Sequence, residues 1–217
     1  MIHPPLQEGI TTMNIELVLV LLGFASLTLI VPGPNNLLLM MSGATFGLRR
    51  TLPHIFGAVL GFSLLMGTSA LGLSQVLLTF PWLGAALKYG GASWLAWFGW
   101  KFIKEAINDQ AGIATQTRAS SRPFRASEAA IFQWANPSAL VLAVSTVSAF
   151  ASVAETASGR AMIICTVFAS VATFATLIWA GAGASLSAAF AAPRAGRVLR
   201  GAMGALIILT AFLITQT

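Results

Sequence analysis

Residues 17–48 read LVLVLLGFASLTLIVPGPNNLLLMMSGATFGL, and this stretch decides the class of fold. It has no ionisable side chain, and it is longer than the roughly 20 apolar residues that a transmembrane helix needs. No Lys or Arg precedes it, so it lacks the positive start of a cleaved signal peptide, and its apolar run is too long for one. The stretch therefore predicts a membrane helix that stays in the mature protein, interrupted by Pro32-Gly33-Pro34.

The composition of the whole chain points the same way. Of the 217 residues, 57% are apolar and only 8% are charged, against about 25% charged residues in an average soluble domain. Because so few charges cannot cover a soluble fold of this size, lipid must be the solvent over most of the surface. The net charge of +6 does not indicate a nucleic-acid-binding protein, since the positive residues stand in the gaps between apolar runs.

The pattern of charge-poor stretches predicts an all-α integral membrane protein with six transmembrane helices. Short gaps separate these stretches except at 105–127, a long polar loop, and no room is left for a soluble domain. Residues 1–13 are expected to form a short N-terminal tail, and 14–217 a single transmembrane domain. The six predicted helices are 17–48, 53–78, 82–102, 128–151, 161–190 and 201–217.

The positive residues are distributed unevenly over the predicted loops. Ten of the twelve Lys and Arg residues follow the first, third and fifth predicted helices, and only Lys88 and Arg160 belong to the other side. Because cytoplasmic loops carry the excess of Lys and Arg, both termini are expected to lie outside the cytoplasm.

The chain also has two similar halves. Pro34-Asn35-Asn36-Leu37-Leu38-Leu39 in the first predicted helix parallels Pro137-Ser138-Ala139-Leu140-Val141-Leu142 in the fourth. With three helices in each half, the second half enters the membrane from the opposite side, which is an inverted repeat of the kind common in transporters. We therefore predict one repeat at 14–104 and its inverted counterpart at 128–217.

Polar residues interrupt the apolar runs at two matching places. Each place has a proline, which removes a helical hydrogen bond, and amide side chains stand beside it. The helix after each break should begin with unsatisfied backbone N–H groups at its positive end, where a carboxylate can bind. Carbonyl groups before the break, together with asparagine side-chain oxygens, could hold an ammonium group. The predicted substrate-binding residues are Pro32, Gly33, Pro34, Asn35, Asn36, Gln133, Asn136, Pro137 and Ser138.

The alternative interpretation of these breaks is purely structural. A proline kink whose amides bond to neighbouring helices needs no ligand, and a single break would favour that interpretation. Two matched breaks in corresponding halves favour a binding site instead. Apart from Lys101 and Glu128 at the ends of two predicted helices, the predicted spans contain no Asp, Glu, Lys or Arg other than Lys88 near one end, so the substrate is expected to be a small zwitterion with a neutral side chain.

Other classes of function find little support in the sequence. His3 and His54 lie in the tail and at a predicted helix start, and no Asp lies in a predicted span, so we expect no catalytic centre, metal site or cofactor. Cys165 is the single cysteine, which excludes a redox thiol pair. A passive channel for small polar solutes is the closest alternative to a transporter, because it too would have kinked helices without charges.

Four short motifs follow one another along the chain and form a recognisable set. They are Pro32-Gly33-Pro34-Asn35, Gly47-Leu48-Arg49-Arg50, Lys88-Tyr89-Gly90-Gly91-Ala92 with Phe98-Gly99-Trp100-Lys101, and Gln133-Trp134-Ala135-Asn136-Pro137. From about residue 14 onward, the chain resembles the LysE/RhtB family of amino-acid exporters. The resemblance implies export of amino acids across the bacterial cytoplasmic membrane, driven by the proton gradient. The Asn35-Asn36 form is closest to the cysteine/O-acetylserine branch, and the homoserine/threonine branch is the next candidate.

Two positions depart from the pattern of that family. Many members carry Asp after Pro-Gly-Pro, where this chain has Asn35, and many carry Lys after the second Asn-Pro, where it has Ser138. The first departure removes an obvious proton carrier and leaves Glu16 and Glu128 at helix ends, where interfacial charges are ordinary. We expect a secondary transporter that exports small neutral amino acids or their derivatives by alternating access. Its expected partners are the substrate and lipid, while proton coupling and homo-oligomerisation stay open.

Overall fold

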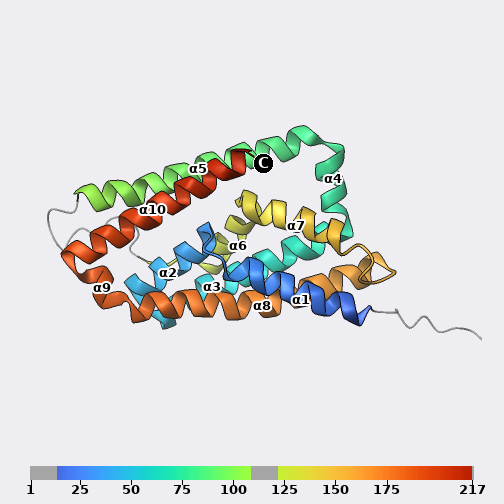
Figure 1. Cartoon of the computed structure of the whole chain (residues 1–217), viewed down its shortest axis with the longest axis horizontal. Helices are drawn as coiled ribbons and strands as arrows, with labels where there is room; N and C mark the ends of the chain where they lie inside the picture. Colours follow the sequence, from blue (N-terminus) through green and yellow to red (C-terminus); the bar gives the residue numbers. More distant parts are fainter. Residues whose placement is uncertain (1–13, 109–121, 217) are drawn as a thin grey trace, which may run out of the picture.

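The computed structural model describes residues 14–108 and 122–216, and both stretches consist of helices joined by short connections, with no β-strand (Figure 1). Long helices run roughly along one direction, and α4 stands across them. In chain order the elements are α1 (Ile15–Ile30), α2 (Pro34–Phe46), α3 (Leu48–Thr68), the π-helical turn η1 (Ser69–Leu73), α4 (Ser74–Thr79), α5 (Pro81–Asn108), α6 (Ala126–Ala135), α7 (Pro137–Ala149), α8 (Ala157–Ser185), α9 (Ser187–Ala191) and α10 (Pro193–Gln216).

Several of these helices are suited to crossing a membrane. Within the described residues, three segments are long and apolar enough, namely Leu48–Leu73, Ala157–Ser185 and Arg194–Leu213. The number rises to five if the bent pairs α1–α2 and α6–α7 each make one crossing. Helix α5 has 28 residues but is not among these segments. The all-helical membrane class is confirmed, and a count of six spans stays a prediction.

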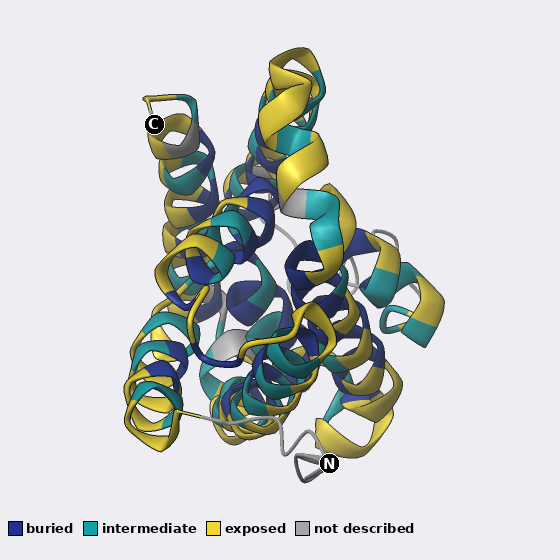
Figure 2. Cartoon of the chain, turned by 90° about the vertical axis from the view of Figure 1, so that its right-hand side faces the viewer, coloured by how far each residue is buried: buried dark blue, intermediate teal, exposed yellow. Residues whose placement is uncertain are grey.

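Large apolar side chains cover the outward faces of the bundle. Phe56 is 63% exposed, Met162 is 71% exposed and Phe174 is 69% exposed. Figure 2 shows exposed residues along the outer sides of the helices and buried residues between the helices. Monomeric soluble proteins rarely expose apolar surface on this scale, so lipid is the solvent that fits it.

Both predicted interruptions divide a helix in two. Helices α1 and α2 are bent by 58°, and α6 and α7 by 66°. Pro34 and Pro137 each occupy the start of the second helix of a pair, where a backbone N–H would have no helical partner in any case. The predicted helices 17–48 and 128–151 are therefore each a pair of helices rather than one continuous element.

The predicted start of the second helix at Pro53 is wrong, because α3 begins at Leu48 and contains Pro53. Gly47 has a φ of 77°, which lets the chain pass from α2 into α3 without a loop. Thr51 Oγ1 then secures the first turn of α3 through a 2.9 Å hydrogen bond to the Gly47 carbonyl. Thr51 also shares a 3.0 Å hydrogen bond with the hydroxyl of Ser42 on α2, which ties the two helices together.

Three other predicted boundaries are wrong. Helix α5 extends to Asn108 instead of ending near residue 102, and α10 begins at Pro193 instead of residue 201. The predicted helix 161–190 is α8 followed by the short α9. Arg200 therefore belongs to a helix, and Lys101 lies within α5 rather than at its end. The predicted tail 1–13, residues 109–121 of the predicted loop, and residue 217 lie outside the described residues.

Small residues set the closest helix contacts. Helix α2 packs against α8, α3 packs against α6, and α5 pairs with α10. A Cβ atom added at any of the glycines in these contacts would collide with the backbone of the facing helix, so a larger side chain would push the helices apart. The facing pairs are Gly43 with Ala180, Gly183 with Met40, Gly57 with Ala126, Gly61 with Ala130, and Gly99 with Gly204.

The buried apolar residues form two main clusters, and each broken helix pair contributes to both. One cluster joins α1, α3, α7 and α8, with Leu21, Leu65 and Phe168 among its fully buried members. The other joins α2, α5, α6 and α10, and it includes Leu95 and Ile207. Because α1 and α7 belong to the first cluster and α2 and α6 to the second, both breaks lie where the chain passes between the clusters.

Candidate functional site

The first break is held together by Asn36, which is 9% exposed. Its side-chain nitrogen donates to the carbonyl oxygens of Leu29 at 2.8 Å and Val31 at 2.9 Å. These carbonyls belong to the end of α1, where the helix leaves acceptors without helical partners. Gly33, the N-cap of α2, by contrast provides no side-chain hydrogen bond to the start of that helix. Asn36 therefore has a structural role, while the amino end of α2 stays uncapped.

The second break is organised by Asn136, which is 5% exposed. Its Oδ1 atom accepts from the backbone N–H of Ser138 at 3.2 Å, and its carbonyl accepts from the N–H of Ala139 at 3.0 Å. The expectation of unsatisfied N–H groups after both breaks is therefore wrong for α7, because an asparagine N-cap supplies their acceptors. The Ser138 hydroxyl is buried beside this cap and has no hydrogen-bond partner.

A direct hydrogen bond joins the two breaks, and we call this pair of side chains the amide bridge. Gln133 Nε2 donates to Asn35 Oδ1 at 2.8 Å, although 98 positions separate the two residues in sequence. Gln133 is 2% exposed, and Asn35 is half-buried. Two places that were matched only by sequence pattern thus lie together in space.

The remaining predicted site residues shape the backbone around the amide bridge. Pro34 and Pro137 are buried, Gly33 is half-buried and Pro32 is exposed. A Cβ atom at Gly91 of α5 would collide with the ring of Pro137, so α5 passes directly against the second break. The prolines therefore set the bends, and polar contact between the breaks comes from the amide bridge.

A cavity of about 370 Å³ is lined by residues from the second half of α2, from α9 and from the first part of α10. These parts of the helices lie toward the left-hand side of Figure 1. The cavity lining is mainly apolar and aromatic, and it includes the cationic residues Lys101, Arg122 and Arg200. No Asp or Glu occurs among the described residues that line it. The prediction that Lys88 is the single cation on the spans is thus wrong, because Lys101 lies inside α5 and Arg200 lies on α10, which begins earlier than expected.

The amide bridge lies close to the wall of this cavity. Leu38, one turn after Pro34 on α2, lines the cavity. Phe132 directly precedes Gln133 and packs on Trp94 with ring centroids 5.1 Å apart, and Trp94 also lines the cavity. A layer of apolar side chains therefore stands between the cavity and the bridge.

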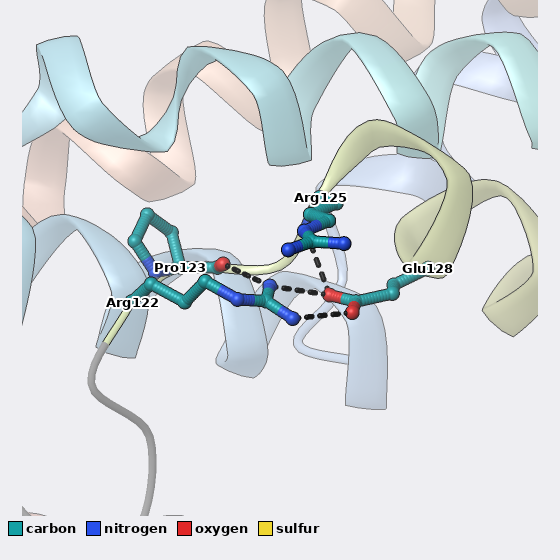
Figure 3. A network of polar contacts seen from close by, with 4 residues as sticks. All are labelled: Arg122, Pro123, Arg125 and Glu128. Atoms are coloured by element: carbon teal, nitrogen blue, oxygen red, sulfur yellow. Dashed lines mark hydrogen bonds and ion pairs between the residues drawn. The ribbon is translucent and has the colours of Figure 1, made fainter.

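One wall of the cavity is fixed by an ion pair at the start of α6. Arg122 Nη1 and Nη2 donate to the two carboxylate oxygens of Glu128 at 2.8 and 2.6 Å, and Nη1 also reaches the Pro123 carbonyl at 3.1 Å (Figure 3). The same carboxylate accepts from the backbone N–H of Arg125 at 2.9 Å, which caps α6. The hydrogen bonds to Glu128, together with its negative charge, raise the pKa of the Arg122 guanidinium above its ordinary value. Glu128 therefore has a structural partner, and Glu16 is exposed in the first turn of α1.

The sequence analysis missed His54 as an interior residue of the bundle. His54 is 2% exposed, it lines the cavity, and neither ring nitrogen has a hydrogen-bond partner. Its ring packs on Phe124 with centroids 5.1 Å apart. The spacing of Thr51, His54 and Ala58 at intervals of three and four residues is the signal that could have placed it on a buried helix face.

Comparison with known proteins gives a family and several relatives. The family model described as LysE type translocator matches residues 17–216. A cysteine/O-acetylserine efflux protein of Escherichia coli O1:K1 / APEC is 29% identical over 161 residues, which cover 74% of this chain and 78% of that protein. A leucine efflux protein of Klebsiella pneumoniae subsp. pneumoniae is 27% identical over 148 residues, which cover 67% of this chain and 68% of that protein. No solved structure gives a significant match.

Proposed function

The chain belongs to the family of LysE type translocators, and from this premise we propose that it is a secondary transporter that exports small neutral amino acids across the bacterial cytoplasmic membrane. Its relatives are efflux proteins whose named substrates, cysteine, O-acetylserine and leucine, all have uncharged side chains. The observation that carries the proposal is the amide bridge, which joins two broken helices inside the bundle.

The amide bridge and its surroundings supply groups that fit a zwitterion. Gln133 Nε2 has a second hydrogen and Asn35 Oδ1 a second lone pair, so each can bond to a substrate. The uncapped start of α2 offers backbone N–H groups and a positive dipole end to the carboxylate. The buried Ser138 hydroxyl, which has no partner, is a further donor near the second break. A substrate bound here would present its carboxylate to α2 and its ammonium to Asn35 Oδ1.

The amide bridge also suggests how substrate binding could be coupled to a conformational change of the transporter. A substrate that bonds to Asn35 or Gln133 competes with the hydrogen bond between them, so binding weakens the contact between the two broken helices. A ligand shifts a conformational equilibrium only by its different affinity for the two states. The competition for the amide bridge supplies such a difference and supports alternating access.

The helix contacts support two inverted repeats, with α5 as the sixth span. The broken pair α1–α2 packs on α8, and the broken pair α6–α7 packs on α3, so each pair contacts the long helix of the other half. Helices α3 and α8 contact each other, as do α5 and α10, so the equivalent helices are paired. Each repeat would consist of one broken helix pair and two further helices. A two-fold axis between two such repeats would place each broken pair against a helix of the other repeat.

Orientation in the membrane can be tested with reporter fusions. Lys101, Arg122 and Arg200 line one cavity, so positive residues from three separate parts of the chain gather at one end of the bundle. This end is expected to be cytoplasmic. Fusions after Arg118 should therefore give a cytoplasmic signal, and fusions after Ser158 a signal from the opposite side. Equal cytoplasmic signals from both positions would contradict the six-span arrangement.

A counterflow assay tests whether the protein is a carrier rather than a channel. Proteoliposomes loaded with unlabelled cysteine or leucine should accumulate the labelled amino acid transiently, because exchange through a carrier is faster than net flow. Uptake should rise at least about fivefold above that of empty proteoliposomes, and protein-free liposomes serve as the control. Uptake that does not depend on internal substrate would instead support a channel. Repeating net export with an imposed pH gradient measures whether protons drive the cycle.

A further inference from the structure

His54 is the starting point for a second binding site in the bundle. Its imidazole is 2% exposed, and both ring nitrogens lack a hydrogen-bond partner, yet it lines a cavity of about 370 Å³. Buried polar groups in native proteins are nearly always bonded, so a buried pair of unpartnered nitrogens on a cavity wall points to an occupant. A neutral imidazole offers one donor and one acceptor to that occupant.

The charges around the cavity indicate which second functional group the occupant carries. Lys101 of α5 and Arg200 of α10 line it, and the Arg200 side chain is only 6% exposed. Lys101 Nζ lies 4.6 Å from the centroid of the Trp97 ring, which holds the ammonium beside the cavity. Arg122 also lines the cavity, with Glu128 as its bidentate partner. With no acidic side chain among the described lining residues, this electropositive wall fits a carboxylate.

The size and walls of the cavity fit a small amino acid. Ligand pockets of about 300–1,000 Å³ are typically apolar with a few convergent polar groups, and this cavity has that character. Trp94 and Phe98, stacked with centroids 5.3 Å apart, supply an apolar surface for a side chain. Trp94 in turn contacts Phe132, the neighbour of Gln133 in the amide bridge. An occupant of the cavity is thus one side-chain layer from the amide bridge.

We propose that this cavity is a loading site that binds the amino acid as a zwitterion before it reaches the amide bridge. Lys101 binds the carboxylate, and the neutral ring of His54 accepts a hydrogen bond from the ammonium group. The inference rests on the proposed function, because it assumes that the transported molecule is an amino acid. It adds a second subsite and assigns one group to each end of the substrate.

The test measures direct binding of labelled leucine and cysteine to the purified full-length protein in nanodiscs. His54→Phe keeps an aromatic ring against Phe124 and removes the unpartnered nitrogens, so its Tm should equal or exceed that of the parent protein. Its affinity for both amino acids should nevertheless fall about 10- to 100-fold, the size expected for a lost hydrogen bond to a charged group. His54→Gln, which keeps an acceptor, should recover most of this affinity. A purely structural histidine would instead lower Tm and affinity together, or leave affinity unchanged.

Substrate analogues assign each end of the zwitterion. The parent protein should bind leucine at least about tenfold more tightly than 4-methylpentanoate, which lacks the ammonium, and than leucinamide, which lacks the carboxylate. His54→Phe should lose the preference over 4-methylpentanoate and keep the preference over leucinamide. Lys101→Met should show the opposite pattern, and Lys101→Arg should behave like the parent protein.

The outcomes separate this inference from the proposed function. If the parent protein exports and binds leucine or cysteine while His54→Phe and Lys101→Met keep full affinity and both preferences, the loading site is wrong and the exporter stands. If the parent protein neither binds nor exports any small neutral amino acid, both proposals are wrong.

Discussion

Replacing Gln133 with alanine is expected to reduce amino-acid export at least about tenfold, with the protein still inserted at the level of the parent. The substitution removes the donor of the 2.8 Å hydrogen bond to Asn35, and it also removes a group that would bond to the substrate. Hydrogen bonds between helices in membranes contribute about 1–2 kcal/mol in model peptides, and about 1.4 kcal/mol corresponds to a factor of ten. Initial export rates of labelled leucine and cysteine from proteoliposomes, divided by the amount of protein, measure the effect.

Matched variants distinguish a functional bridge from a structural one. Gln75→Ala removes the same side chain from an exposed position on α4 and should export like the parent protein. If Asn35 and Gln133 act as a unit, the double variant Asn35→Ala/Gln133→Ala should be no worse than either single variant. Full additivity of the two losses, or export at the rate of the parent protein after either substitution, would contradict the proposed site.

Asn136→Ala provides a useful contrast, because the structure gives this amide a capping role. Loss of an asparagine N-cap costs about 1 kcal/mol of stability. Because Asn136 Oδ1 already accepts from the Ser138 N–H, we expect a lower Tm together with reduced export. Gln133→Ala should reduce export with a smaller change in Tm.

The bends of this fold could be predicted from sequence because they depend on local covalent chemistry. Proline has no backbone N–H, so it is favoured at the start of a helix, as Pro34 and Pro137 are here. The same reasoning gave a wrong helix start at Pro53, because tertiary contacts let α3 begin earlier, at Leu48. Gly47 adopts a positive φ and Thr51 bonds to Ser42 of α2, and neither feature can be read from the pattern around Pro53.

The sequence predicted only those residues of the candidate site that lie near the two helix breaks in the chain. The pattern selected both Asn35 and Gln133, but their contact spans 98 positions and depends on how the two halves pack. The capping bond of Asn136 and the two bonds of Asn36 were unpredictable for a similar reason, since each amide could equally have faced a ligand. His54 was missed because one wrong helix boundary placed it at a helix start.

The structure also revises the expected exclusion of charged substrates. The expectation of a neutral side chain assumed, for acidic substrates, that no cation in the spans would meet the second carboxylate. Lys101 and Arg200 line the cavity, so that assumption fails, and the structure gives no reason to exclude acidic amino acids. The argument against cationic substrates becomes stronger, because the described lining has positive charges and no carboxylate.

Export of lysine is therefore expected to be about a hundredfold less efficient than export of leucine or cysteine. A second ammonium group in the membrane core without a partner costs at least about 2.5–3.5 kcal/mol, and each 1.4 kcal/mol is a factor of ten. Repulsion from Lys101 and Arg200 adds to this penalty on the way in. Cells that overproduce the protein should resist toxic analogues of small neutral amino acids and stay sensitive to analogues of lysine and arginine. Resistance to the cationic analogues alone would show that the proposed preference for neutral substrates is wrong.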